Sequence, residues 1–387
     1  MKRWRSETGA AGPVILALAA LDAAGYSVIA PALPAISDAT GAGPALIGAL
    51  VATFPAGALV GFALAGPGVR QGRTREVLEC GLVVVAVGCL GFIASDDLAV
   101  LFPARTLMGL GSGGLWMGVT FATLERTPGR EYLGMSRLLA AYSAGSLIGP
   151  TLGAIGGIRG PFAAYLALVL AGLLALPLLR PPRERRTFAS DWSALRLPGF
   201  WFACAAGLVA VIGLGIIEGV LPLHLAAELS QAQIGGLYAG LALLLAGTAV
   251  AAGYASPRAV IAAGTGLLVV GIALAGLTET PPAWIASLAV AGIGFGLTET
   301  GSAGALFEAV ETERIVTAMI VWSQIGIVGY LIGPLAGGAV AEGLSFAWIG
   351  IVPLAAAVGL AALALVLRGR YAAAAGSTAV SARNGTR

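Results

Sequence analysis

The sequence Gly145-Ser-Leu-Ile-Gly-Pro150-Thr-Leu-Gly153 returns later in the chain as Gly329-Tyr-Leu-Ile-Gly-Pro334-Leu-Ala-Gly337. The two stretches are 184 residues apart, counted from Pro150 to Pro334, in a chain of 387 residues. A shorter pair recurs at nearly the same offset, Gly109-Leu-Gly111 and Gly292-Ile-Gly294. A repeat at this distance predicts two matched halves.

Composition places both halves in a membrane. Hydrophobic residues make up 58% of the chain and charged residues 11%, and the mean hydropathy is +0.92. Soluble domains have about 25% charged residues. Apolar runs of about 20 residues, the length that crosses a bilayer as a helix, recur along the whole chain. We therefore expect an all-α membrane protein with twelve transmembrane helices in two pseudo-symmetric six-helix bundles, in which the many glycines allow close packing. The expected spans are residues 13–35, 44–66, 77–95, 98–123, 136–157, 161–179, 200–223, 232–254, 258–277, 283–306, 315–340 and 345–367.

Charge in the loops predicts the orientation, because cytoplasmic loops are enriched in Lys and Arg. Basic residues precede the first span and follow spans two, four, six and twelve, whereas acidic residues dominate the other loops, with Arg159 as the basic exception. Both termini are therefore expected in the cytoplasm. The basic start and first apolar run also fit a secretory signal peptide, but the run is longer than a typical signal sequence and contains Asp22.

The domain boundaries follow from the longest polar stretch. Residues 180–198 contain a Pro-Pro pair and a run of arginines, and they divide the chain nearly in half. We expect a six-helix bundle at 1–179, a cytoplasmic linker at 180–198, a second bundle at 199–368 and a cytoplasmic tail at 369–387.

Several classes of function are disfavoured by what the chain contains. The three cysteines lie in apolar runs without ligand or disulfide spacing, and the single histidine, His224, has no partner pattern for a metal. The one lysine is Lys2, so no Walker A motif is present, and no Gly-x-Ser-x-Gly or His-Glu-x-x-His occurs. We expect no enzyme activity, no metal or other cofactor, and no nucleotide or nucleic-acid partner.

Four motifs carry a resemblance to a known family. The first span has Asp22 followed by Pro31-Ala-Leu-Pro34, and the fourth contains Arg105-Thr-Leu-Met-Gly109. The fifth carries the Gly-x-x-x-Gly-Pro-x-x-Gly pattern, and the seventh ends Glu218-Gly-Val-Leu-Pro222. Together they resemble the major facilitator superfamily, specifically its twelve-helix drug:proton antiporter branch, which also includes vesicular monoamine transporters. The fifth-span pattern looks like the antiporter motif, and its residues with their repeat are Gly145, Gly149, Pro150, Gly153, Gly329, Gly333, Pro334 and Gly337.

The loop after the second span resembles another motif of this family in a degenerate form. It reads Gly66-Pro-Gly-Val-Arg70-Gln-Gly72-Arg73, which is one residue short and lacks the motif's Asp. The resemblance implies a gating network of ion pairs at this loop, and the missing Asp argues against one here.

Charged residues inside apolar spans are the candidate site. A charge at the centre of a bilayer costs about 2.5 to 3.5 kcal/mol on insertion scales, so Asp22, Arg105, Glu218 and Glu299 require a reason to be there. A buried carboxyl group holds its proton more tightly than an exposed one and can exchange it between the two sides of a membrane. Asp22 and Arg105 differ in depth by only about 7 Å at 1.5 Å per residue. We therefore expect Arg105 to pair with deprotonated Asp22.

These carboxylates favour cationic or weakly basic substrates, because a cation and a proton compete for the same group. The alternative for Glu218 and Glu299 is that they lie near helix ends and reach water. Trp116 and Trp322 are candidate cavity aromatics, with packing or an interface position as the alternative.

The sequence and the resemblance together predict a secondary transporter that exports small organic, cationic or amphipathic compounds in exchange for protons by alternating access. The export direction is implied by the resemblance to the antiporter motif alone. The chemistry is that of multidrug efflux, driven by the proton gradient. Two alternatives on the same fold remain, a sugar or siderophore-type exporter and a proton-coupled uptake symporter. A composition rich in Ala, Gly and Arg with one Lys suggests a bacterial source, so the bacterial inner membrane is the expected location, with a monomer in the lipid bilayer.

Overall fold

The computed structural model describes residues 11–127, 130–179, 192–252, 256–311 and 314–384. Within these residues the chain is helical, and no strand occurs among them. The elements are, in order, α2 (Ala11–Ser27), η1 (Ala30–Ala32), α3 (Leu33–Thr40), α4 (Pro44–Arg70), α5 (Thr74–Ala94), α6 (Leu98–Arg126), α7 (Glu131–Gly153), α8 (Arg159–Ala175), η2 (Leu176–Leu178), η3 (Trp192–Arg196), α9 (Pro198–Gly219), α10 (Leu221–Leu225), α11 (Gln231–Ala252), α12 (Pro257–Leu277), α13 (Pro281–Ala309), α14 (Ile315–Gly343), η5 (Phe346–Trp348) and α15 (Ile351–Asn384).

Ten helical segments of the described chain are long and apolar enough to cross a membrane. They coincide with ten of the spans expected from the sequence. The fifth and eighth expected spans correspond to α7 and α11, which are 23 and 22 residues long and are not among the ten.

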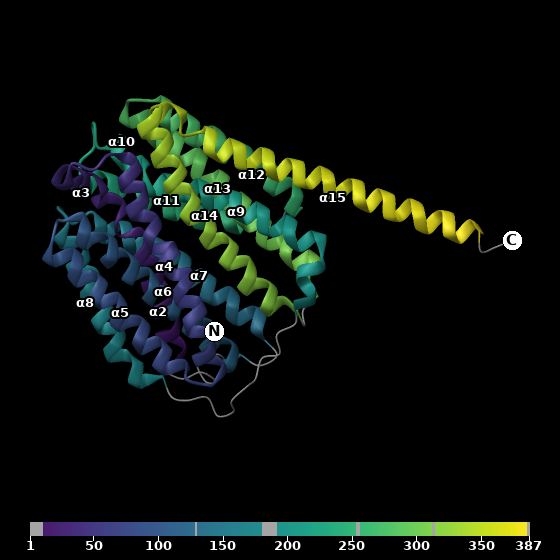
Figure 1. The fold of residues 1–387 in the computed structure, drawn as a ribbon, viewed down its shortest axis with the longest axis horizontal. Coiled ribbons are helices and arrows are strands. Elements are labelled where there is room, and N and C mark those ends of the chain that lie inside the picture. The colour runs from purple at the N-terminus through teal and green to yellow at the C-terminus, as the bar shows by residue number, and fades with distance from the viewer. Residues whose placement is uncertain (1–10, 128–129, 180–191, 253–255, 312–313, 385–387) are drawn as a thin grey trace.

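The same packing scheme appears twice along the chain. In the first half, α2 to α8, helix α2 packs on α6, α7 and α8, and in the second half, α9 to α15, helix α9 packs on α13, α14 and α15. Likewise α5 packs on α6 and α8 as α12 packs on α13 and α15, and α4 packs on α6 as α11 packs on α13. The repeat seen in the sequence is therefore also a repeat of helix contacts. Figure 1 shows the first half in purple to teal and the second in teal to yellow.

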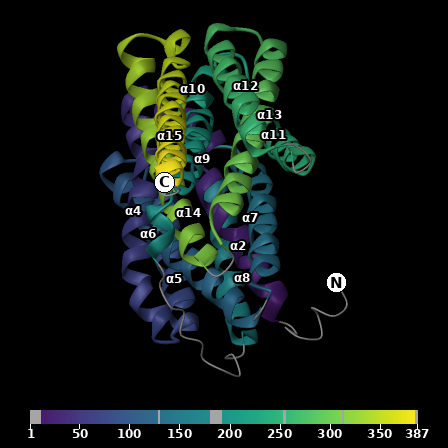
Figure 2. The same ribbon diagram turned by 90° about the vertical axis from the view of Figure 1, so that its right-hand side faces the viewer.

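The two halves meet through two helix pairs, α4 with α14 and α7 with α11. Each pair joins the second long helix of one half to the fifth of the other. Smaller contacts join α3 to α10 and η1 to α11. We call the end of the bundle that holds α3 and α10 the far end, and the opposite end, where residue 179 leaves the first half, the linker end. Figures 1 and 2 show these ends from two directions.

The last helix extends beyond its membrane span. The candidate span Phe346–Leu367 matches the predicted twelfth span, residues 345–367, and α15 continues past it to Asn384, into the region predicted as a tail. Figure 1 shows it projecting beyond the bundle. The predicted linker falls largely outside the described residues, which resume at η3.

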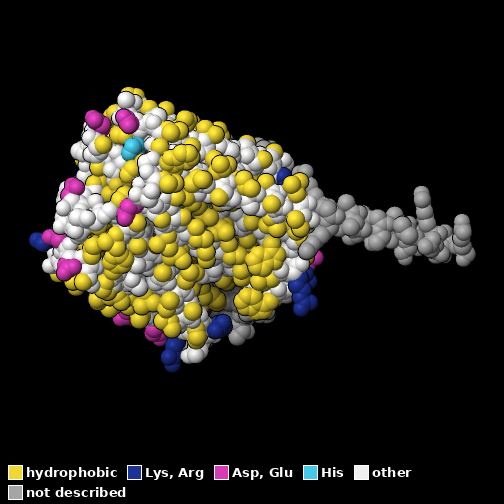
Figure 3. Space-filling view, turned by 45° about the horizontal axis from the view of Figure 1, so that its top comes forward, with side chains coloured by type: hydrophobic (Ala, Val, Ile, Leu, Met, Phe, Trp, Pro, Cys, Tyr) yellow, Lys and Arg dark blue, Asp and Glu magenta, His cyan; other side chains and the backbone are white. Residues whose placement is uncertain are grey.

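The outer surface is suited to lipid. Large apolar side chains such as Leu64, Leu174 and Leu365 are exposed on the outside of the bundle. Figure 3 shows one face covered by hydrophobic side chains, with charged side chains at its margins. In a hydrocarbon solvent such exposure carries no hydrophobic cost, because lipid tails are as apolar as these side chains.

Candidate functional site

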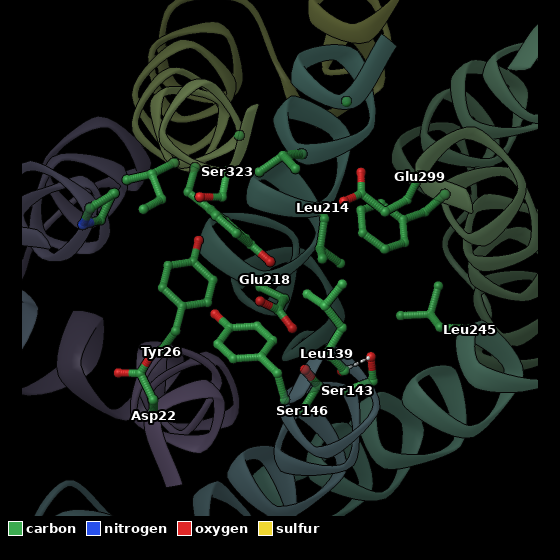
Figure 4. A pocket seen from close by; sticks show the side chains of 18 of the residues that line it. Asp22, Tyr26, Leu139, Ser143, Ser146, Leu214, Glu218, Leu245, Glu299 and Ser323 are labelled. Carbon is green, nitrogen blue, oxygen red and sulfur yellow. Dashed lines mark hydrogen bonds between the residues drawn. The ribbon is translucent and has the colours of Figure 1, made fainter. Parts of the chain in front are cut away.

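A cavity of about 370 Å³ lies between the two halves. Its walls come from α2, α4, α6 and α7 on one side and from α9, α11, α13 and α14 on the other. Figure 4 shows side chains from both halves pointing into it. Placement between the halves means that a bound molecule contacts both of them at once.

Three carboxyl groups predicted from the sequence all line this cavity. Asp22 projects from α2, Glu218 from α9 and Glu299 from α13. Asp22 and Glu218 are 4% and 8% exposed, so neither reaches water at a helix end. In Figure 4, Glu218 lies between Asp22 on one side and Glu299 on the other. Among the described residues that line the cavity there is no lysine, arginine or histidine, so its charge is acidic.

Buried oxygen atoms in the cavity wall lack hydrogen-bond partners within the described part of the chain. They are Asp22 Oδ1, Tyr26 Oη and Glu299 Oε2. A buried polar atom without a partner costs about 1 to 3 kcal/mol. The two carboxylate oxygens are acceptors, so a molecule that satisfies them must donate hydrogen bonds.

Arg105 does not form the expected ion pair with Asp22. Its side chain is fully buried behind the cavity wall, and its two terminal nitrogens donate to the backbone carbonyls of Gly25 at 2.9 Å and Tyr26 at 2.7 Å. The guanidinium also lies over the Phe54 ring at 4.3 Å. The prediction of an Arg105–Asp22 pair is therefore wrong for this structure.

The reason lies in the end of α2. Pro31 has no N–H, so it cannot continue the helical ladder past Ser27, and α2 stops there before η1 begins. The last carbonyls of a helix have no partner within it and carry partial negative charge. Arg105 supplies donors and a positive charge to two of them, so it fixes the chain one turn beyond Asp22.

Two tyrosine hydroxyls bond the backbone next to Asp22 and Glu218. Tyr165 of α8 donates to the carbonyl of Leu21 at 3.1 Å, immediately before Asp22. Tyr238 of α11 donates to the carbonyl of Ile217, immediately before Glu218. Each carboxylate is thus on a backbone segment anchored from a neighbouring helix.

The sequence analysis predicts only two of the aromatic rings in the cavity wall, those of Trp116 and Trp322. Besides the predicted Trp116, the wall contains Tyr26, Tyr142 and Tyr330. The Tyr26 and Tyr330 rings, one from each half, lie 4.2 Å apart, and Tyr142 packs edge-on against Trp116 at 5.0 Å. A tyrosine in the middle of an apolar span was the available signal, because its hydroxyl is costly in lipid and needs a polar neighbour.

Trp322, the second predicted aromatic, also lines the cavity. Its indole N–H donates to Ser302 Oγ at 2.8 Å, and that hydroxyl donates to the Ala203 carbonyl at 2.9 Å. A second cavity of about 20 Å³ shares Trp116 and Trp322 with the first and continues to Met319, near the start of α14. Trp116 and Trp322 therefore line both cavities on the side that faces the start of α14.

His224 is part of an aromatic cluster at the far end. Its ring stacks on Phe346 at 4.8 Å and meets Trp284 edge-on at 5.4 Å. His224 Nε2 and Trp284 Nε1 both lie within hydrogen-bond distance of the Thr278 carbonyl, at 3.0 and 2.6 Å. No group of three or more potential metal ligands occurs in the described part of the chain.

Residues 15–258 match the family model described as the Major Facilitator Superfamily. The chain belongs to the Major Facilitator Superfamily. The synaptic vesicular amine transporter of Rattus norvegicus is 26% identical over 302 residues, which cover 71% of this chain and 58% of that protein. The enterobactin exporter EntS of Escherichia coli O1:K1 / APEC is 30% identical over 224 residues, 50% of this chain and 51% of that protein. The matches thus span little more than half the length of these relatives.

Solved structures of the superfamily share the fold over nearly the whole chain. A bacterial homolog of the human lysosomal transporter Spinster, inward-facing and unoccupied, has a TM-score of 0.73 at 15% identity and covers 94% of this chain and 93% of its own. The nucleoside transporter NupG has a TM-score of 0.70 at 14% identity, with 91% and 98% covered. This is a carrier fold, and superfamily members are in general not enzymes.

The residues that resemble the superfamily's antiporter motif lie at tight helix contacts. A Cβ on Gly145 would lie 1.9 Å from the Ala20 carbonyl oxygen on α2, and one on Gly333 would lie 2.4 Å from the Ile212 carbonyl oxygen on α9. Gly149 lies against the end of α2, at Ala24 and Ser27, and Gly153 lies against Val28 and Pro31 just beyond it. Gly329 and Gly337 of α14 lie against α9 and the residue that follows it in the same way. Both glycine rows therefore bring a helix with an internal proline against the helix that carries a cavity carboxylate.

The degenerate loop motif forms a tight turn. Gly72 has a φ of +74°, a conformation that favours glycine, and the Arg73 N–H donates to the Gly68 carbonyl at 3.0 Å. Arg70 follows Gly66 at the end of α4. Within the described residues, neither Arg70 nor Arg73 has a carboxylate partner. These two arginines thus form no ion pair within the described part of the chain, in keeping with the missing Asp of the motif.

Proposed function

We propose that this protein is a secondary transporter that exports small cationic or amphipathic organic compounds in exchange for protons by alternating access. The observation that carries the proposal is a cavity between two repeated halves, lined by Asp22, Glu218 and Glu299 and by no basic side chain within the described residues. A protonated or quaternary amine neutralises such a site, whereas an anion adds to its charge.

Aromatic rings add to this preference. Tyr26, Tyr142, Tyr330 and Trp116 share the cavity with the carboxylates. The face of an aromatic ring attracts a cation by about 0.5 to 2 kcal/mol, depending on how far the cation is desolvated. A flat organic cation can therefore stack on a ring while its charge faces a carboxylate.

Exchange follows from competition for the same groups. When a cation occupies the cavity, the carboxylates are held in their charged form, and when it leaves, protons replace it. A carrier that moves between two open states only with one or the other bound couples the two fluxes without a nucleotide. The proton gradient then supplies the energy.

The orientation is part of the proposal. We assign the linker end to the cytoplasm, because the loops there carry most of the Arg residues, and we place the protein in a bacterial inner membrane. We also assign α7 and α11 as the fifth and eighth of twelve spans, which completes two six-helix bundles and leaves both termini in the cytoplasm.

The similarity to the enterobactin exporter supports a second candidate, export of a siderophore-type compound. The acidic cavity favours a cationic substrate over a siderophore-type one. A cation that donates hydrogen bonds both balances the charge and satisfies the carboxylate oxygens that have no partner within the described residues.

Transport into proteoliposomes tests the proposal. We expect liposomes with an acidic interior to accumulate the aromatic cation ethidium, and to lose this accumulation when the pH gradient is collapsed or when Asp22, Glu218 and Glu299 are all converted to their amides. Equal accumulation by the triple variant, or gradient-driven transport of anions alone, would refute it.

A further inference from the structure

Two polar contacts that belong to no motif join the halves at the far end of the bundle. One is made by Gln231, the first residue of α11, and the other by Glu342, near the end of α14. Each lies where a helix with an internal proline ends against the beginning of a helix from the opposite half. We infer that Gln231 and Glu342 act as a pair of latches that hold the far end shut and set how often it opens during transport.

Gln231 binds the turn after α7 through its whole amide group. Its Oε1 accepts from the Gly157 N–H at 2.9 Å, and its Nε2 lies within hydrogen-bond distance of the carbonyls of Gly153 at 2.8 Å, Gly157 at 3.0 Å and Ile155 at 3.2 Å. One side chain of the second half therefore ties together the end of α7 and the turn that follows it in the first half.

The start of α11 is capped by residues other than Gln231. Ser230 and Gln233 cap this helix reciprocally, since the Ser230 N–H donates to Gln233 Oε1 at 2.9 Å and the Gln233 N–H donates to Ser230 Oγ at 3.4 Å. Gln231 is left to bond across the interface.

Glu342 caps a helix of the other half. Pro44 is the first residue of α4, and no side chain of its own N-cap, Gly43, satisfies the free N–H groups there. Glu342 Oε2 accepts from the Ala45 N–H at 2.9 Å, and its negative charge faces the positive end of the α4 dipole. Gly43 leaves room for it, since a Cβ there would lie 2.6 Å from Glu342 Oε2.

Close backbone contacts surround both latches. A Cβ on Gly235 would lie 2.8 Å from the Pro150 carbonyl oxygen, and one on Gly48 would lie 2.2 Å from the Pro334 carbonyl oxygen. The two prolines are the equivalent residues of the sequence repeat. Separation of the halves at the far end must therefore break these backbone contacts together with the latches.

The inference deepens the proposed function, since it names residues that control one step of alternating access. A different measurement tests it, because opening of the far end is measured without substrate and without a proton gradient. The two ideas therefore fail separately.

The test is a distance measurement between spin labels at the far end, one in each half. Labels are attached to Ala99→Cys, in the first turn of α6, and Thr280→Cys, immediately before α13, in a background with Cys80→Ser, Cys89→Ala and Cys204→Ala. Both sites are exposed. Pulsed electron resonance then reports the fraction of molecules with a widened far end, whichever side of the membrane that end faces.

We expect Gln231→Ala and Glu342→Ala each to raise the widened fraction by about fivefold, as the loss of about one net hydrogen bond predicts. The double variant should exceed either one. Gln233→Ala is the matched control, because it removes a glutamine two residues along the same helix that bonds only locally, and it should leave the distances unchanged. Gln231→Asn serves in place of Gln231→Ala if the latter does not fold. Distances in both latch variants that match those of Gln233→Ala would overturn the inference.

Discussion

Arg105 Nη2 donates a hydrogen bond of 2.7 Å to the carbonyl oxygen of Tyr26, four residues after Asp22 on the same helix. The arginine thus acts on the backbone beyond the carboxylate and leaves the carboxylate itself facing the cavity. This relationship separates two roles in the site: Arg105 holds the end of α2, and Asp22 remains available to a proton or a cation.

Removing the arginine should destabilise the fold. Arg105→Ala leaves the Gly25 and Tyr26 carbonyls without their side-chain donor and opens a void, at a cost of about 2 to 4 kcal/mol. Arg105→Lys should recover only part of this, because one ammonium cannot bond both carbonyls as the planar guanidinium does. Tryptophan fluorescence on heating in detergent measures the effect. An unchanged unfolding temperature for Arg105→Ala would show that these bonds contribute nothing.

Glu218 should contribute strongly to cation affinity, since it lies between Asp22 and Glu299 in the cavity. Glu218→Gln keeps the shape and removes the charge, and we expect ethidium binding to weaken by about tenfold, in line with the loss of a charged hydrogen-bond partner. The control is Glu228→Gln, an exposed acid at the far end. Fluorescence titration measures both, and equal affinity in the two variants would count against a charge-based site.

The ring of Trp116 should matter more than its indole N–H. Trp116→Phe keeps an aromatic face and should lower ethidium affinity by less than about threefold, whereas Trp116→Leu should lower it by about tenfold. The same titration applies. If Phe and Leu behave alike, the ring acts only by filling space.

The glycines of α7 that pack against α2 should tolerate no side chain. Gly145→Ala places a Cβ 1.9 Å from the Ala20 carbonyl oxygen, a backbone atom that cannot move aside, so α7 must shift away from α2. We expect a marked loss of folded protein. Gly236→Ala is the control, because nothing lies within 4 Å of its Cβ position and alanine favours a helix by about 1 kcal/mol. Size-exclusion profiles of the two variants should differ clearly, and two intact profiles would mean that the α2 and α7 contact is not tight.

The helices and the cavity carboxylates could be predicted from the sequence because both follow from the cost of polarity in lipid. Apolar length marked the spans, and the cost of a central charge singled out Asp22, Glu218 and Glu299. The hydrogen-bond partners of Arg105 could not be predicted in this way. Position along a helix gives the depth of a residue but not the groups that compete for its hydrogen bonds, and the carbonyls released where α2 ends were stronger partners than Asp22.

The contacts between the halves could not be predicted from the sequence alone either. Gln231 and Glu342 lie at span ends, where a polar side chain ordinarily meets water, and nothing in their neighbours indicates a partner 74 or 297 residues away. Tyr26 and Tyr330 are similar, since their ring contact joins helices from opposite halves. The continuation of α15 to Asn384 is consistent with the alanines after residue 370, because alanine favours helix. Composition alone does not distinguish such a helical extension from an irregular tail.

Proton release on addition of substrate is the direct measure of cation–proton exchange by this protein. Inverted membrane vesicles carrying the wild-type protein or Asp22→Asn are exposed to cationic, neutral and anionic compounds while the internal pH is followed. The account predicts that cations, and not anions, drive protons out of vesicles with the wild-type protein, and that Asp22→Asn abolishes this release. Release of equal size in the variant, or no release with any cation that the wild-type protein transports, would contradict it.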